Sequence, residues 1–447
     1  MSAGAAAEEA GKTDFEQRFA DTSAAASELA KSGSLGEGVD RLLRLEKACR
    51  LANQWDVTIK AALQIVSLCY ECGEWDALNA NLVLLSKRRS QHQKVITAIV
   101  AEAMKFLERP INEAERLRLI ETLRAVTEGK IYVELERAKL TRMLAVIKEH
   151  DGDLAGASTT LQEVQVETIG SMSVREKTEY VLEQMRLTMA NSDFVRTKML
   201  SNKISSESIR AKELQDLKLR YYDLMIQFHV HEDGPSELWR DFDAIYRTPT
   251  VQDDEGRALD TLRHMVLFLA LTEYAIEPYT ALEGLRKLDR KALEKLPAYQ
   301  RLVHSLTTQE VIAWPLADES ELHAHSVFNN VERWGESSAG WWDMLHLRVT
   351  EHNIRVVAKY YSRIQINHLA RMLGLTEDKL ERAVSNMVTG QQKLYARIDR
   401  PEGIISFSRP QAADEVLNDW SADISQLLDL VERTDHLINK EMQVHGK

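Results

Sequence analysis

The residues best suited to chemistry are two cysteines at the spacing of a redox or zinc motif. Cys69 and Cys72 form a C-x-x-C pair, which can ligate zinc through its thiolates or close a disulfide. The chain has only three cysteines, so no second pair exists to complete a four-cysteine zinc site. The helical period around the pair places both thiols on an apolar stripe, where cysteine packs as a small hydrophobic residue. We therefore predict a structural role for them and no bound metal.

A second candidate is the histidine pair His323 and His325. Zinc isopeptidases of the JAMM type carry such an H-x-H pair, followed eight and eleven residues later by serine and aspartate. In this chain those two positions hold Arg333 and Glu336. A basic residue in place of the serine does not suit that zinc site, so we interpret both histidines as structural or surface residues of a helix-rich connector.

The chain also lacks the common motifs of enzymes. It contains no phosphate-binding loop, no G-x-G-x-x-G fingerprint, no G-x-S-x-G elbow and no H-E-x-x-H. The basic run Lys87-Arg88-Arg89 could be a phosphate patch or a nuclear signal, but bases at a helix end also complement the helix dipole, and we interpret the run as a solvated face. We predict a protein that is not an enzyme, with no catalytic residues and no cofactor.

The elements that would position functional residues are clearest near the end of the chain. An apolar helical stripe stops at Gly374, which suits the left-handed conformation of a helix C-cap. Thr376 and Glu377 are typical of a helix N-terminus, so a second helix should run from about Glu377 to Thr389. The first stripe consists of Ile366, Leu369, Ala370 and Leu373. Two helices joined in this way form a helix-turn-helix.

A β-hairpin should follow these helices. Apolar and polar residues alternate from Leu394 to Ile398, which predicts a strand with one apolar face. The segment Arg400-Pro401-Glu402-Gly403 has turn chemistry, with proline second and glycine fourth. A second strand should then run from Ile404 to Phe407. The sequence therefore predicts a winged helix over residues 354–408.

A winged helix can bind DNA, but the charge of this one argues against it. The helix that would enter the major groove begins Glu377-Asp378-Lys379-Leu380-Glu381-Arg382, with three acids against two bases. The whole chain has a formal charge of −12, so no basic field compensates. Contact with other proteins is the better interpretation of this module.

The final segment carries a heptad pattern. Apolar residues recur every seven positions and a second set fills the alternate spacing, which gives about three heptads of an a/d seam. The first set is Leu417, Ile424, Val431 and Ile438, and the second is Trp420, Leu427 and Thr434. Because this seam exceeds what one winged helix could cover, we predict a helical bundle formed with other subunits.

Length and composition favour helices in the rest of the chain. Aromatic residues make up only 6% of the 447 residues, with eight prolines and nineteen glycines. From near Gly38 to about Pro315, amphipathic stripes follow one another with short polar breaks. The clearest pair is residues 131–150 and the segment after Asp153, where Leu154, Ala157, Leu161 and Val164 share a face. We find no strict period and predict an irregular α-solenoid of the TPR-like kind.

The sequence shows no sign of secretion or membrane insertion. Three cysteines are too few for a disulfide framework, and the N-terminus lacks a basic segment followed by an apolar one. The longest apolar run, Met265 to Leu271, is far shorter than the roughly twenty residues that span a bilayer. Residues 1–37 have few large apolar groups, which predicts a disordered tail. We expect a soluble protein of the cytoplasm and nucleus.

A helical-repeat arm that leads into a winged helix resembles the PCI-domain subunits shared by the proteasome lid, the signalosome and the translation initiation factor 3 complex. Within these, the chain is similar to the family of the lid subunit called non-ATPase regulatory subunit 12. The stretches that carry the resemblance are Gly152 to Ala157, Leu161 to Thr168, Tyr360 to Ile364 and Tyr395 to Ile405. On this basis the domains are a disordered tail (1–37), a TPR-like helical-repeat arm (38–315), a PCI module (316–410) and a C-terminal bundle helix (411–447).

The resemblance implies a non-catalytic scaffold of the 26S proteasome lid. Its implied partners are other PCI lid subunits, the lid deubiquitinase, the ATPase base and the core particle, with no nucleic acid and no membrane. We expect contacts through the hairpin at Tyr395, Arg397 and Asp399. The C-terminal helix should contribute Leu417, Trp420, Ile424, Leu427 and Val431. The alternatives are the equivalent PCI subunit of the signalosome and, more distantly, a nucleic-acid-binding winged helix.

Overall fold

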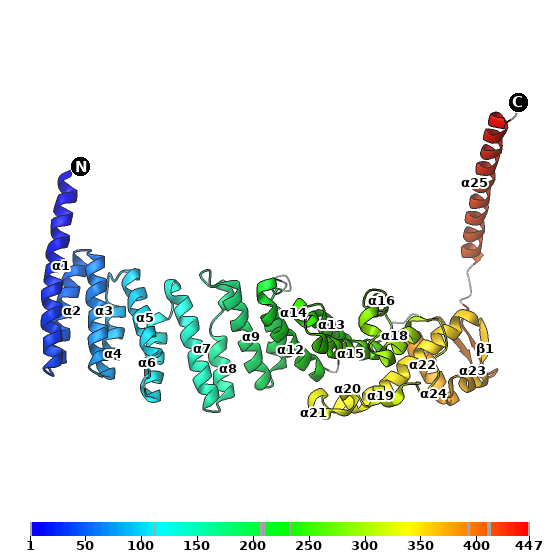
Figure 1. Cartoon of the computed structure of the whole chain (residues 1–447), viewed down its shortest axis with the longest axis horizontal. Helices are drawn as coiled ribbons and strands as arrows, with labels where there is room; N and C mark the ends of the chain where they lie inside the picture. The colour runs from blue at the N-terminus through cyan, green and yellow to red at the C-terminus, as the bar shows by residue number, and fades with distance from the viewer. Residues whose placement is uncertain are drawn as a thin grey trace. The chain divides into compact units, whose positions relative to one another are not determined.

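The computed structural model of the chain describes residues 2–110, 112–205, 209, 211–232, 234–390, 394–408 and 413–445. These residues are mainly helical and include one three-stranded sheet (Figure 1). The predicted fold class, a helical arm followed by a winged helix and a long C-terminal helix, is confirmed. The chain divides into two compact units, Met1–Leu224 and Met225–Lys447. Across the described residues, no helix combines the length and the apolar composition that a membrane crossing requires.

The first unit is a succession of helices joined by short turns (Figure 1). In chain order they are α1 (Ser2–Lys31), α2 (Leu35–Leu51), α3 (Trp55–Glu71), α4 (Trp75–Lys87), α5 (Gln93–Leu107), α6 (Glu113–Thr127), η1 (Ile131–Val133), α7 (Glu134–His150), α8 (Leu154–Gln162), η2 (Val166–Thr168), α9 (Val174–Ala190), α10 (Phe194–Ser201) and η3 (Lys212–Leu214). Helix α12 (Gln215–His231) leads out of this unit. The pair predicted around Asp153 is α7 and α8, but α8 ends at Gln162, so Val164 lies beyond the helix.

A recurring turn gives the first unit its repeat. After five helices, one residue takes a positive φ between 56° and 86°, and these residues are Gly33, Asn53, Gly73, Gly152 and Ser192. The backbone N–H of the next residue then donates to the carbonyl five positions earlier, at 2.9–3.2 Å, which is the Schellman pattern. The first three turns lie twenty residues apart. Because glycine, asparagine and serine share this position, the period is hidden in the sequence.

The disordered tail predicted over residues 1–37 is wrong for much of its length, because α1 occupies most of it. Phe15 and Phe19 pack against buried residues of α2 and α3, and Ala26 is fully buried. These three residues follow a helical period, so a few apolar groups suffice to hold the helix. Gly38 allows close approach, since a Cβ there would lie 3.0 Å from the Ala26 carbonyl oxygen.

Two side-chain predictions in this unit are also wrong. Arg88, expected on a solvated face, forms an ion pair with the fully buried Glu46, which Arg50 also contacts at 3.2 Å. Helix α4 ends at Lys87, and Arg88 donates to a backbone carbonyl of α2. Cys72, expected on the apolar stripe, is the exposed C-cap of α3. The last buried residue of the apolar stripe is Cys69, two residues before the helix ends.

The second unit is built around one apolar helix. Its helices before the winged-helix region are α13 (Pro235–Tyr246), α14 (Pro249–Gln252), α15 (Glu255–Leu271), α16 (Ile276–Leu288), α17 (Arg290–Leu293), α18 (Pro297–Thr307), α19 (Glu319–His323), α20 (Ser326–Asn329), α21 (Val331–Trp334), η4 (Glu336–Gly340) and α22 (Trp341–Tyr360). All seven residues of the apolar run Met265 to Leu271 are at most 3% exposed. A helical segment that is apolar all round belongs in a core, and α15, which contains this run, packs against α13, α18 and α22.

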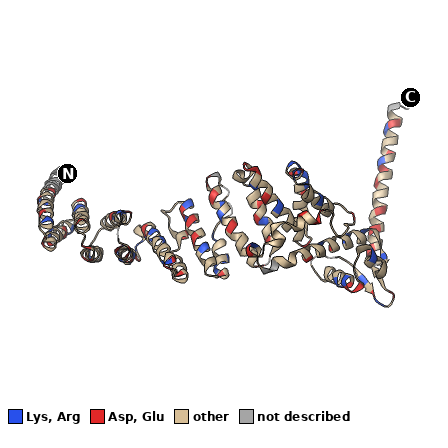
Figure 2. Cartoon of the chain, turned by 60° about the horizontal axis from the view of Figure 1, so that its bottom comes forward, with Lys and Arg blue, Asp and Glu red and all other residues tan. Residues whose placement is uncertain are grey.

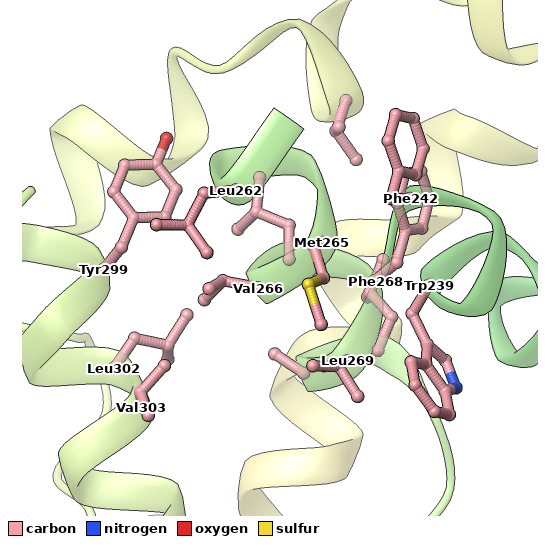
Figure 3. Close-up of a cluster of buried hydrophobic side chains, with 14 of the residues drawn as sticks. Trp239, Phe242, Leu262, Met265, Val266, Phe268, Leu269, Tyr299, Leu302 and Val303 are labelled. Carbon is pink, nitrogen blue, oxygen red and sulfur yellow. The ribbon is translucent and has the colours of Figure 1, made fainter. Parts of the chain in front are cut away.

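The side chains of this core come from both sides of α15 (Figure 3). Leu262 and Val266 lie near residues of α18, while Met265 and Phe268 lie near the aromatic rings of α13. Phe268 stacks on Phe242 with ring centres 5.6 Å apart. This core anchors α22, whose C-terminal half enters the winged helix.

Candidate functional site

The winged helix begins where α22 ends. It comprises β1 (Arg363–Gln365), α23 (Ile366–Leu373), α24 (Glu377–Thr389), β2 (Arg397–Asp399) and β3 (Ile404–Ser406). The predicted stop of the first helix is confirmed, because Gly374 takes the left-handed conformation with φ 66°. The predicted second helix, Glu377 to Thr389, is confirmed as α24. Thr376 occupies the N-cap, although its side chain makes no capping hydrogen bond.

The sheet has one more strand than the predicted hairpin. Its order is β1-β3-β2, with both pairs antiparallel, so β3 is the central strand. The predicted turn is confirmed by the bond from Gly403 N–H to Arg400 C=O at 3.2 Å. The first hairpin strand begins at Arg397 rather than Leu394. Sequence patterning missed β1 because three residues, of which only Ile364 is buried, are too few to show alternation.

β2 has an outer side with which no described strand pairs. Phe407 N–H, at the end of β3, donates to Ser362 C=O on the β1 side. In an antiparallel sheet, alternate residues of a central strand bond to opposite neighbours. Every second residue of β3 before Phe407 therefore bonds toward β1, and the residues between them bond toward β2. Arg397 and Asp399 pair with those residues between, so their backbone groups are hydrogen-bonded to β3. The backbone N–H and C=O of Ile398 therefore face the outer edge. Such an edge can accept a strand from another chain.

The predicted hairpin residues lie on this strand or next to it. Arg397 and Asp399 are exposed, and Tyr395 is 39% exposed just before β2. Asp399 also has a local role, since its Oδ1 accepts from Glu402 N–H at 3.5 Å in the turn. Lys393, the residue just before the predicted first strand, lies outside the described residues. The structure brings the three predicted residues together, and their role as contacts stays a prediction.

The charges of the module do not form a basic surface. Helix α24 begins with Glu377 and Asp378, and Glu381 further along pairs with Arg400 of the turn at 2.5 Å. In Figure 2, basic and acidic residues are mixed along the helices of this unit. A nucleic-acid interface needs clustered bases that can neutralise phosphates. The described charges of the module therefore lack the pattern that favours DNA binding, and protein contact stays the prediction.

Helix α25 (Ala413–His445) is the second part of the candidate site. Every residue from 413 to 443 is exposed. The five predicted bundle residues, Leu417, Trp420, Ile424, Leu427 and Val431, are between 40% and 63% exposed. The predicted heptad seam is therefore present and uncovered, as expected of a helix that packs on other chains.

The apolar face of α25 is wider than an a/d seam. Further exposed apolar residues lie beside the seam, namely Val416, Leu428, Leu430, Leu437 and Met442. In the heptad set by Leu417 they occupy e and g positions, on both flanks of the seam. The signal was present in the sequence but lay outside the strict three-four spacing. A face of this width suits a bundle of more than two helices.

The histidine pair has the structural role predicted from the sequence. The His325 Nδ1 accepts from Val327 N–H at 3.3 Å and caps the short α20. Burial, followed by the neighbouring His264, lowers the pKa of His325 to about 4. His323 is exposed, with its ring edge-on to Trp342 at 4.9 Å. In the part of the chain that the structure describes, no three His, Cys, Asp or Glu residues are placed to hold a metal ion.

Family models match three parts of the chain. Residues 37–254 match the family described as "PSMD12/CSN4, N-terminal", and residues 323–409 match "PCI domain". Residues 414–446, which include nearly all of α25, match "26S proteasome regulatory subunit RPN5 C-terminal domain". The first description covers two groups of proteins, whereas the last carries a proteasome name alone.

Curated relatives match almost the whole chain. The 26S proteasome non-ATPase regulatory subunit 12 of Dictyostelium discoideum is 40% identical over 421 residues, covering 94% of this chain and 92% of the relative. The chain belongs to the non-ATPase regulatory subunit 12 family. Homolog B of that subunit in Arabidopsis thaliana is 38% identical over 444 residues, covering 93% of this chain and 98% of the relative. The 26S proteasome regulatory subunit RPN5 of Saccharomyces cerevisiae is 35% identical over 412 residues, or 91% of each chain.

Membership of the non-ATPase regulatory subunit 12 family confirms the predicted resemblance. These relatives are named as regulatory subunits, which fits the prediction of a protein that is not an enzyme. The two candidate surfaces are the outer edge of β2 and the apolar face of α25.

Proposed function

We propose that this chain is a non-catalytic scaffold subunit of the lid of the 26S proteasome regulatory particle, acting in ubiquitin-dependent protein degradation. The observation that carries the proposal is the exposed apolar face of α25, in a segment that matches the RPN5 C-terminal domain. Leaving so much apolar surface in water is unfavourable, so this face should be covered by partners. The proteasome names of relatives that match nearly the full length support the same assembly.

The two surfaces would contribute differently to assembly. The α25 face supplies apolar area and should provide most of the binding free energy. The β2 edge supplies backbone hydrogen bonds, and Tyr395, Arg397 and Asp399 beside it would provide side-chain selectivity. Its partner would be the winged helix of a neighbouring PCI subunit. The helical arm of the first unit offers a long surface for the ATPase base, the core particle and the lid deubiquitinase.

The signalosome subunit remains the alternative assembly. The N-terminal family description includes CSN4 as well as PSMD12, so this region alone does not separate the two. The C-terminal match and the full-length relatives favour the proteasome. A nucleic-acid-binding function is disfavoured by the acidic start of α24. We also propose that the protein acts in the cytoplasm and the nucleus.

The test is to tag the chain in its own cells, purify it gently at low salt and identify the co-purifying proteins by mass spectrometry. We expect the proteasomal ATPases, the core particle and the other lid subunits. A chain truncated after Phe407, which lacks α25, is the control and should lose the lid subunits. Recovery of a cullin-bound complex without ATPases would contradict the proposal and support the signalosome.

A further inference from the structure

A pocket in the second unit contains a partly buried cation, Arg355, that forms no ion pair with any described residue. The pocket lies beside the C-terminal half of α22 and is closed by the start of α16, the end of α18 and the segments next to them. It has two adjoining hollows with cavity volumes of about 40 and 80 Å³. Both are lined by Tyr274, Tyr279, Leu306, His352 and Arg355. These volumes exceed the space of one water molecule.

Arg355 is the residue that needs explanation. Its guanidinium carbon lies 3.7 Å from the centre of the Tyr274 ring, so the group is stacked on one aromatic face. Its Nε is buried and has no hydrogen-bond partner. Burial lowers the pKa of Arg355, which shows that its surroundings disfavour the charge. Among the described residues no carboxylate forms an ion pair with it, and a buried polar group left in this way costs stability.

The acidic residues of the pocket form ion pairs with another arginine. Arg348, also on α22, binds both carboxylate oxygens of Glu351 at 2.9 and 3.0 Å. It also contacts Glu273 at 3.2 Å. Glu351 lies one helical turn before Arg355, yet its side chain points its oxygens at Arg348. The charge of Glu351 still favours the positive charge of Arg355 through space, but the described residues show no ion pair between the two side chains.

The rest of the pocket shows which kind of anion would fit. Its walls are largely apolar, and Pro278, Leu282 and Val356 contribute to them. His352 approaches the Glu310 carbonyl oxygen through Nε2 at 3.3 Å, and burial lowers its pKa, so it adds no charge near neutral pH. Lys359, one turn after Arg355, is exposed at the rim. One inner cation between apolar walls matches a singly charged group better than a phosphate.

We propose that this pocket binds a carboxylate group carried on an apolar body, as at the C-terminus of a peptide that ends in leucine. The guanidinium fork matches the two oxygens of a carboxylate, and Arg–carboxylate pairs form such paired hydrogen bonds readily. The apolar walls would hold the attached side chain. Nothing in the proposed scaffold function requires this site, so the two proposals can fail separately.

The test uses the full-length chain and ligand-observed NMR with N-acetyl-L-leucine. N-acetyl-L-leucinamide is the matched probe, because it differs only in lacking the charged carboxylate. We expect binding of the acid to be at least about tenfold tighter, since hydrogen bonds to charged groups are stronger than those to neutral groups. Equal binding of the acid and the amide would overturn the proposal.

Variants locate the binding. Arg355→Gln should remove it, while Arg371→Gln, which changes an exposed guanidinium on α23, should leave it intact. Thermal unfolding of both variants shows whether they fold. If Arg355→Gln does not fold, Lys359→Gln at the exposed rim provides the readout and should weaken binding of the acid without altering the unfolding midpoint. Unchanged affinity in whichever of these two pocket variants folds would contradict the assignment.

Three further probes distinguish the sources of the carboxylate. A peptide that ends in a free leucine carboxylate should bind at least as tightly as N-acetyl-L-leucine, and its C-terminally amidated form should not bind. Weaker binding of that peptide would restrict the site to small carboxylic acids. Acetate should bind more weakly than N-acetyl-L-leucine, because it lacks the apolar body. Inorganic phosphate binding more tightly than N-acetyl-L-leucine would overturn the choice of ligand.

Discussion

Helices α24 and α25 carry the same kind of apolar stripe, yet only α24 is covered by its own chain. In α24 the residues Leu380, Ala383, Val384 and Met387 are at most 4% exposed and pack against β3 and α22. In α25 the corresponding seam is between 40% and 63% exposed at the five predicted positions. The comparison teaches that periodicity predicts which face of a helix must be covered. It does not say whether the cover comes from the same chain.

The largest effect should come from removing a covered residue. Leu380→Ala leaves a cavity in the winged-helix core, where Leu380 is fully buried. We expect the free energy of unfolding of the module to fall by about 2–5 kcal/mol. Chemical denaturation of the full-length chain, followed by a probe in this module, measures it. A loss below about 1 kcal/mol would show that the core of the winged helix tolerates the cavity and would weaken the contrast with α25.

A pH titration extends the comparison to histidines. The pKa of His325 falls from 6.5 to about 4 because the side chain is buried, whereas His436 of α25 is exposed. Between these two pH values the unfolded chain binds more protons than the folded one, so stability is lost as the pH falls from 6.5 toward 4. The loss should be on the order of 3 kcal/mol for this residue.

His325→Asn, which keeps a helix-capping side chain, should remove that part of the pH dependence. The matched control His436→Asn should leave it unchanged. Unfolding free energies measured at several pH values decide between the outcomes. Equal pH profiles for wild type and His325→Asn would show that the burial of this histidine has no thermodynamic consequence.

The β2 edge should give a smaller effect. Ile398→Pro removes one outward N–H, while the β2–β3 ladder uses the residues on either side. We expect association with a neighbouring PCI subunit to weaken by about tenfold, as loss of one hydrogen bond predicts. Ile398→Val keeps the N–H and should bind normally. Equal binding by the proline and valine variants would exclude strand addition at this edge.

The smallest effect should come from truncating an uncovered residue. Leu427 is 61% exposed, so Leu427→Ala should change the stability of the isolated chain by less than about 0.5 kcal/mol. Denaturation under the conditions used for Leu380→Ala gives a direct comparison. A loss close to that of Leu380→Ala would mean that α25 packs on its own chain.

The sequence predicted a helix correctly where several local signals agree. The bounds of α24 were found because a glycine stop, a capping residue and an apolar stripe agree around Gly374 and Thr376. The heptads of α25 were found because they extend over several turns. By contrast, β1 has only three residues, and it forms a strand only because it pairs with β3. The tail was mistaken for disorder because average composition concealed the helical spacing of Phe15 and Phe19.

Features that depend on distant segments could not be predicted. Arg88 was predicted to be solvated, and its ion pair with Glu46 was missed. The two residues lie about forty positions apart, so no local pattern marks the pair. The pocket at Arg355 is formed by α16, α18 and α22, and no local pattern marks it. The exposure of Arg397 and Leu417 was easier to predict, because exposure on a regular element follows from its period. What covers them depends on other chains.

The most direct test of the account is the incorporation of an α25 variant into the assembled complex. Ile424→Asp with Leu427→Asp places two charges on the apolar face, where burial should cost several kcal/mol. The matched control, Ser425→Asp with Gln426→Asp, adds the same charges to the opposite face of the helix. Tagged forms of both are purified and the co-purifying lid subunits are quantified against wild type. We expect loss of the lid subunits for the first variant and normal recovery for the control, whereas full incorporation of the first variant would show that the apolar face of α25 is not buried in the complex.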